Sequence, residues 1–343
     1  MKTSLSDNLA AAGPASAASS ASSPFNRELR RHTLSAGAFL AVMLLVPAVF
    51  GTGYYLNTLN FVALLALPTL GLSLLSGLSG QLAISHGAFF ALGAYGSAIL
   101  STNLGITPLL STVLAQVIVV LIAAAIGSVV LRLRSHYLAI ATLSFAIIVE
   151  LLIEEARSLT GGMQGMLGIP PIDVGFMELT SDLEIYLLYW PITIVMLWFA
   201  LNISSSGVGR VLRAVREGEP VLGSLGIHAP RYKIGIYILS SIYAGVGGSL
   251  YAHFVGFVTP ATGSIMFAIE IIMVLALGGF DRLWGALVGA ALMTLLNEYA
   301  LGFADFKRII LGVGLIVIML VFPRGLLPGL IDTARHWFAR RAG

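Results

Sequence analysis

Glu270 is the residue of this chain whose type and surroundings point most directly to chemistry. It stands in the run IMFAIEIIMVLALGG, about 9 Å from the nearer end of the apolar segment if that segment is helical. Where such a segment crosses a bilayer, an unpaired carboxylate is costly, so acids at these positions are functional candidates. Glu270 is therefore a candidate to receive the ammonium group of a solute. The alternative is a protonated or internally paired structural group, with His86 or His253 as its partner.

Gln81, Ser85 and His86 form a second group of candidates. The stretch SGLSGQ joins two apolar runs, and the second run begins LAISHGAFFALGAYGSAIL. Irregular backbone at membrane depth is tolerated only inside protein or beside water, so this stretch is a candidate lining for a solute path. The alternative is close helix packing, because small residues recur through the second run. His86 and His253, each taken alone, are more typical of buried hydrogen-bonding groups than of ligands.

Basic residues gather in the segment 204–233, where Arg210, Arg213 and Arg216 recur at every third position. Valine and leucine fill positions between them, which is typical of a short helix with one basic and one apolar face. An apolar face that emerges from a membrane needs a surface to pack against. We expect that surface to belong to another protein.

A break is expected inside this segment. Pro220 interrupts a helix but suits the first position of a new one, and Gly226 suits the left-handed position just past a helix end. The pattern predicts a helix, a break and a second helix of about six residues. The residues expected to contact the partner protein are Arg210, Arg213, Arg216, Glu217, Glu219 and Gly226.

No pattern in the chain predicts an enzyme. The chain has no cysteine, which excludes thiolate metal sites, and no residues with metal-ligand spacing or an acid, base and nucleophile constellation. It also lacks the G-x-x-x-x-G-K-[ST] phosphate loop of many ATPases. We expect no catalytic residue, metal or cofactor in this chain. The net charge of +3 is small and does not indicate a nucleic-acid partner.

The composition places these candidates in a membrane protein. Of 343 residues, 57% are hydrophobic and 10% are charged, against roughly 45–50% and 25% in a soluble domain. Apolar runs near the length that crosses a bilayer predict an all-α, polytopic fold with about ten spanning or partly re-entrant helices. The expected spans are 34–50, 56–76, 82–100, 108–131, 137–153, 185–203, 234–257, 264–279, 285–300 and 309–322.

The basic residues predict the orientation of these spans. With both termini in the cytoplasm, nearly all arginines and lysines fall on the cytoplasmic side, and the acidic loop 154–184 falls outside. Residues 1–33 are expected to form a disordered, Ala/Ser-rich cytoplasmic tail. We expect residues 34–325 to form the membrane domain, with the segment 204–233 as its cytoplasmic loop, and residues 326–343 to form a basic cytoplasmic tail.

Seven separated stretches together resemble the permease subunits of bacterial ABC importers for branched-chain amino acids. The resemblance extends from about residue 34 to the end, and TGG in the external loop is typical of the larger permease of the pair. The stretches are LSGQLAISHGAFFALGAY (78–95), RLRSHYLAIATLSFA (132–146), TGGMQGMLGIP (160–170), GRVLRAVREGEPVLGSLGI (209–227), RYKIGIYILSSIYAGVGGSLYAHFVGFVTP (231–260), IEIIMVLALGGFDRLWGALVGAAL (269–292) and FPRGLLPG (322–329).

The resemblance implies a subunit of an ATP-driven importer in the bacterial inner membrane. Its partners would be a second permease that shares the solute path, two cytoplasmic ATPases that bind the ATP, and an external solute-binding protein. Residues 209–227 correspond to the loop that docks on an ATPase, although the importer signature Glu-Ala-Ala is only loosely present as Glu219–Pro220–Val221. A different hypothesis from the residues alone is an ion-coupled carrier with Glu270 as its proton or sodium site.

Overall fold

The computed structural model describes residues 24–299, except 50, 52, 134, 174–177, 225 and 281, together with residues 312, 313 and 320. The expected tail 326–343 and most of the expected span 309–322 lie outside these residues. The elements are α1 (Pro24–Val49), α2 (Gly53–Ser79), α3 (His86–Thr102), α4 (Pro108–Val130), α5 (Ser135–Glu155), α6 (Arg157–Thr160), η1 (Gly162–Gln164), β1 (Met166–Leu167), α7 (Asp182–Ser205), α8 (Gly207–Ser224), α9 (Ala229–Val255), β2 (Phe257–Val258), η2 (Pro260–Gly263), α10 (Ile265–Gly278) and α11 (Leu283–Tyr299).

The all-α, polytopic fold is confirmed. Within the described residues, seven helices are long and apolar enough to cross a membrane. Each of the first nine expected spans coincides with a helix, and apart from the start of α1 the ends differ by a few residues. One boundary of the expected N-terminal tail is wrong. Residues 24–33 are the start of α1, because Pro24 suits the first position of a helix.

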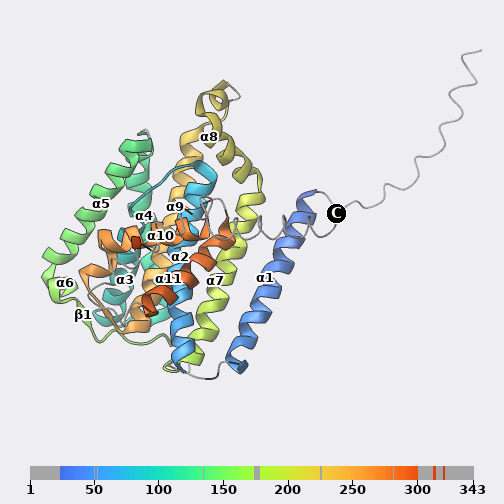
Figure 1. Ribbon diagram of the computed structural model, residues 1–343. Helices are drawn as coiled ribbons and strands as arrows, with labels where there is room; N and C mark the ends of the chain where they lie inside the picture. Colours follow the sequence, from blue (N-terminus) through green and yellow to red (C-terminus); the bar gives the residue numbers. More distant parts are fainter. Residues whose placement is uncertain are drawn as a thin grey trace, which may run out of the picture.

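The helices form a bundle whose two ends differ. In Figure 1, α8 projects from one end, whereas α6 and β1 lie toward the other. The short strands β1 and β2 pair in antiparallel register, with Met166 opposite Val258. Arg132, Arg216 and Lys233 come from three separate segments and line one cavity near α8, so these three segments meet at the same end of the bundle.

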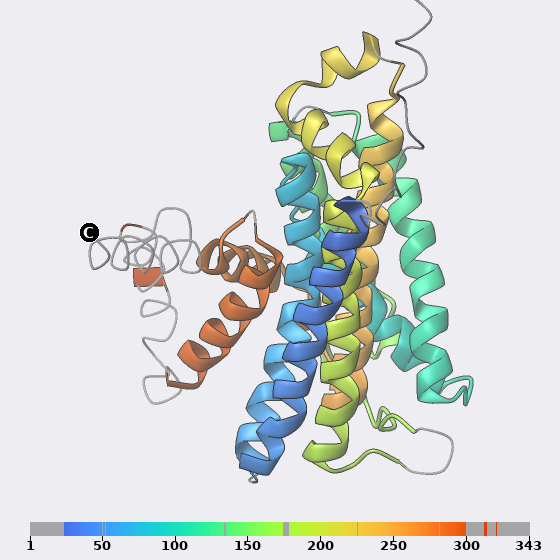
Figure 2. The same cartoon turned by 90° about the vertical axis from the view of Figure 1, so that its right-hand side faces the viewer.

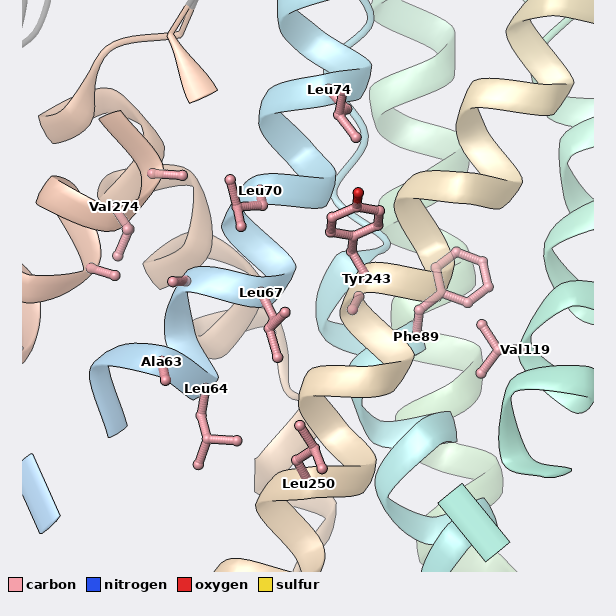
Figure 3. Packing of buried hydrophobic residues seen from close by; sticks show 14 of the residues in the cluster. Ala63, Leu64, Leu67, Leu70, Leu74, Phe89, Val119, Tyr243, Leu250 and Val274 are labelled. Atoms are coloured by element: carbon pink, nitrogen blue, oxygen red, sulfur yellow. The ribbon is translucent and has the colours of Figure 1, made fainter. Parts of the chain in front are cut away.

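The core is built around α2, α3 and α9, which pack against one another and against α4 and α7. Leucines on α2 are fully buried, and Figure 3 shows α2 lying between α10, which carries Val274, and α9, which carries Tyr243 and Leu250. The outward faces of α1, α4 and α5 are apolar and exposed, for example at Leu45, Leu121 and Ile140. An apolar exterior is what a bilayer requires.

Glycines set the spacing between α3 and α9. A Cβ added at Gly93 would fall on the backbone carbonyl of Gly245, and one added at Gly248 would fall on the carbonyl of Phe90. The main chains of the two helices are therefore in direct contact. Close packing of small residues is one of the two roles expected for the run after residue 82, and the structure confirms it.

The helices α10 and α11 are short, with 14 and 17 residues. At helical rise they are about 21 and 26 Å long, less than the roughly 30 Å of a bilayer core. They pack against each other and against α2. Figure 2 shows them to one side of the long helices and inclined to them.

Candidate functional site

The chain between α2 and α3 forms non-helical backbone from Gly80 to Ser85. Gly80 has a φ of +68°, the left-handed region that suits glycine just after a helix. The break comes a few residues later than the sequence predicts. Helix α2 continues to Ser79 and ends at the left-handed Gly80, and in its last turns the hydroxyls of Ser76 and Ser79 donate to the carbonyls of Leu72 and Leu75.

This broken segment is held well inside the bundle. The backbone N–H of Ile84 donates to Thr142 Oγ1 of α5 at 3.0 Å. The hydroxyl of Ser85 lies 2.9 Å from that of Tyr237, which is about 12 Å along α9 from its first residue. Irregular backbone therefore lies at membrane depth, and α3 begins there rather than at the end of the bundle.

Two buried acceptors, one in the broken segment and one in the first residue of α3, have no hydrogen-bond partner among the described residues. His86 Nδ1 lies 3.3 Å from the carbonyl of Ala83 and must donate to it, since a carbonyl only accepts. That leaves Nε2 as an acceptor, and both His86 Nε2 and Gln81 Oε1 are buried without a partner. An unpaired buried group costs about 1–3 kcal/mol, so each of these atoms favours a donor such as water or an ammonium.

Glu270 lies in a separate cavity of about 230 Å³, whose walls include Phe61, Phe90 and Tyr251. Its Oε1 accepts a hydrogen bond of 2.8 Å from Asn297 Nδ2 on α11. Glu270 is therefore paired inside the chain, as one of the two hypotheses expects, but its partner is Asn297 of α11 rather than His86 or His253. The structure groups Gln81, Ser85 and His86 in one segment and leaves Glu270 apart from them.

His253 connects the core to the loop after η1. Its Nδ1 lies 2.7 Å from the carbonyl of Pro170, and its Nε2 lies 2.7 Å from Ser97 Oγ. Both ring nitrogens are therefore satisfied, as expected for a buried hydrogen-bonding histidine. The sequence did not predict Ser97 and Pro170 as partners of His253, because both are far from it along the chain and no motif connects them. Within the described residues, no group of three or more histidines and acids is arranged to hold a metal ion.

The arginines of α8 turn back toward the ends of the spanning helices. Arg213 Nη1 donates to the carbonyl of Ser204 at 2.9 Å, and Arg210 Nη1 donates to that of Ser205 at 3.4 Å. Arg216 Nη1 donates to the carbonyl of Gly77 at 2.9 Å. Cations are favourable beside the carbonyls that end a helix. These bonds fasten α8 to the last turns of α7 and α2.

The apolar face of α8 packs on this chain itself, which corrects the expectation that another protein covers it. Leu212 is fully buried, and Val215 and Leu222 are buried beside Ala229 of α9. The helix is broken at Gly218, whose φ of 178° and ψ of 93° are not helical, and it resumes before Ser224. The predicted helix, break and second short helix are therefore confirmed. Pro220 then stands in the first turn of the second helix, where its missing N–H is tolerated.

The outer side of α8 remains accessible. The side chains of Arg210, Arg213, Arg216 and Glu217 are exposed, and Gly226 adopts the expected left-handed conformation with a φ of +74°. The side chain of Glu219 lies outside the described part of the chain. The role of this surface in binding a partner stays a prediction.

Comparison with known proteins gives the family. A family model described as the branched-chain amino acid transport system permease component matches residues 54–320. The chain belongs to this permease family. It is 31% identical, over 283 residues, to the high-affinity branched-chain amino acid transport system permease proteins LivM of Salmonella typhimurium and Escherichia coli. That similarity covers 76% of this chain and 66% of each relative, slightly under two thirds of their length.

The chain is also similar to a second permease of Escherichia coli. The high-affinity branched-chain amino acid transport system permease protein LivH of Escherichia coli is 26% identical over 281 residues, which is 76% of this chain and 90% of the relative. No solved structure matches the permease. The higher identity to LivM agrees with the resemblance to the larger permease of the pair.

Proposed function

We propose that this chain is the membrane-spanning permease subunit of an ATP-driven importer for branched-chain or related amino acids in the bacterial inner membrane. Family membership supports the transport role, and the names of the LivM and LivH relatives support the solute class. Escherichia coli has both kinds of permease, which supports a second permease as the partner that completes the solute path. A solute-binding protein on the external side would deliver the amino acid.

The broken segment 80–85 carries this proposal. Discontinuous helices at membrane depth commonly mark solute sites in transporters, since helix N-termini favour an anionic group and freed polar groups bind the rest. Here the N-terminus of α3 lies beside two buried acceptors, His86 Nε2 and Gln81 Oε1. The carboxylate of a zwitterionic amino acid suits the N-terminus of α3, and its ammonium suits the two acceptors. Glu270 contributes at the other end of the path.

The coupling to two cytoplasmic ATPases rests on α8. A motor that moves a membrane domain needs a rigid element through which to push. The arginine bonds to the ends of α7 and α2 make α8 such an element, and its outer side is open to a partner. Because this chain has no phosphate loop, ATP binds to the partners.

Reconstitution of the purified complex in liposomes tests the proposal. With ATP inside and the binding protein outside, we expect L-leucine to accumulate against its gradient, and we expect no accumulation when either permease or the ATPases are omitted. Accumulation by this chain alone, insensitive to ATP depletion and collapsed by an ionophore, would contradict the proposal and favour the ion-coupled carrier.

A further inference from the structure

A cavity of about 750 Å³ lies between the broken segment and α8. Its walls come from the end of α2, the end of α4, the middle of α8 and the start of α9. The described residues that line it are Ser76, Ser79, Gly80, Gln81, Leu82, Leu131, Arg132, Leu133, Val215, Arg216, Pro230, Lys233 and Phe280. Such a volume is typical of sites for small molecules.

The charged groups on these walls fit a carboxylate. Arg132, Arg216 and Lys233 are cations from three different segments, and the described lining contains no acid. Lys233 is mostly buried, with 9% of its surface exposed. Arg216 Nη1 donates to the carbonyl of Gly77, which holds the guanidinium beside the end of α2. Cations held in a partly buried cavity bind carboxylates more strongly than those on an open surface.

The uncharged polar groups fit an ammonium. Gln81 Oε1 is a buried acceptor without a partner among the described residues. Ser76 and Ser79 donate their hydroxyl hydrogens to carbonyls of α2, at 2.7 and 2.6 Å, so their oxygens retain only acceptor capacity toward the cavity. All three groups can therefore accept hydrogen bonds from a positively charged donor.

The remaining walls are apolar and suit an aliphatic side chain. Leu82, Leu131, Leu133, Val215 and Phe280 supply branched and aromatic surface next to the polar groups. A ligand that carries a carboxylate, an ammonium and an aliphatic branch would satisfy every class of wall. An anionic lipid would satisfy the cations and the apolar walls but would leave the acceptors unmatched.

We propose that this cavity is a second solute site, which binds the amino acid as a zwitterion on the α8 side of the broken segment, before release. The proposal rests on the proposed function, because it places the solute on its way to the cytoplasm. Lys233 and Arg132 hold the carboxylate, and Gln81 accepts from the ammonium. Because Gln81 also belongs to the site at the broken segment, the amino acid occupies the two sites in turn. The site is distinct from the Glu270 cavity.

A single cysteine tests this proposal, because the chain has none of its own. Leu133 lines the cavity and is 43% exposed, so Leu133→Cys in the assembled importer should react with an impermeant maleimide in inside-out vesicles. We expect L-leucine to slow this reaction. Leucinamide, which lacks the carboxylate, and 4-methylpentanoate, which lacks the ammonium, should each need roughly tenfold higher concentrations for the same protection.

Matched variants identify the carboxylate partner. In the Leu133→Cys chain, Lys233→Met should abolish the difference between leucine and leucinamide, whereas Lys233→Arg should keep it. Arg132→Met should weaken protection in the same way without altering a buried residue. Arg31→Met is the control, because Arg31 is an exposed cation of α1 outside the cavity.

Two outcomes would overturn the proposal. One is an importer that accumulates leucine with ATP while leucine leaves the labelling rate of Leu133→Cys unchanged; the transport function would then stand without this site. The other is protection by anionic phospholipid but not by leucine, which would make the cavity a lipid site. Failure of the wild-type complex to accumulate leucine would instead reject the proposed function, and the site with it.

Discussion

At the scale of single residues, the glycines of α9 perform different tasks although the sequence presents them alike. Gly248 faces the carbonyl of Phe90 so closely that a Cβ would overlap it, whereas a Cβ at Gly235 would meet nothing within 4 Å. Both residues are inside the same helix. Contact with α3, rather than helix propensity, therefore explains Gly248.

This contrast predicts opposite effects for one substitution. Gly248→Ala should destabilise the protein by about 1–3 kcal/mol, because the added carbon forces α3 and α9 apart. Gly235→Ala should be neutral or stabilise it by about 0.5–1 kcal/mol, since glycine is unfavourable in a helix interior. Thermal unfolding in detergent measures both. Equal effects of the two substitutions would mean that the α3–α9 contact does not determine stability.

At the scale of elements, α8 and the broken segment are joined through Arg216. The guanidinium binds the carbonyl of Gly77, and the aliphatic part of the side chain lies under Gly80, where a Cβ would come within 2.8 Å of Arg216 Cγ. We expect a movement of α8 to be passed through these contacts to the segment that we propose binds the solute. This gives Arg216 a role inside the chain in addition to any role at its outer surface.

Alanine substitutions at two left-handed glycines test this linkage. Gly80→Ala and Gly226→Ala both pay about 1–2 kcal/mol for the left-handed backbone, but only Gly80→Ala also collides with Arg216, since nothing lies within 4 Å at Gly226. Gly80→Ala should therefore destabilise the protein more. The excess should disappear when Gly80→Ala is measured in an Arg216→Ala background. An excess that persists there would exclude Arg216 as its cause.

The elements were largely predictable from the sequence, and their connections were not. The lengths of the apolar runs located nine helices, and the glycine at position 226 correctly predicted a left-handed residue after a helix end. The pairing of Glu270 with Asn297 depends on how α10 and α11 align across the hairpin, which the run lengths do not determine. The hydrogen bond from Arg216 to Gly77 depends on where α2 ends. Helical periodicity predicts only the face of α8 on which Arg216 lies, not the group that it binds. The prediction that another protein covers the apolar side of α8 failed for the same reason.

At the scale of the whole molecule, the alternation of helices places α6 and α8 at opposite ends of the bundle (Figure 1). The excess of arginine and lysine near α8 predicts that this end faces the cytoplasm. Ser158 of α6 and Gly223 of α8 are both exposed. They can therefore report the orientation of the chain in a membrane.

Single cysteines at these positions should react from opposite sides. In spheroplasts, whose inner membrane is intact and accessible from outside, an impermeant maleimide should label Ser158→Cys and should not label Gly223→Cys. Inside-out vesicles should give the reverse pattern. Labelling of both positions from one side would contradict the proposed orientation and, with it, the contact of α8 with cytoplasmic ATPases.

The direct contact between the main chains of α3 and α9 also limits how such a protein can move. Side chains that meet at an interface can change rotamer and let helices slide, but a carbonyl pressed against a glycine has no such freedom. Helices α3 and α9 must then turn together as one body, and the broken segment at the start of α3 travels with them. In the proposed importer, opening of a passage would then fall to the elements that surround this body, α5 and the α10–α11 hairpin.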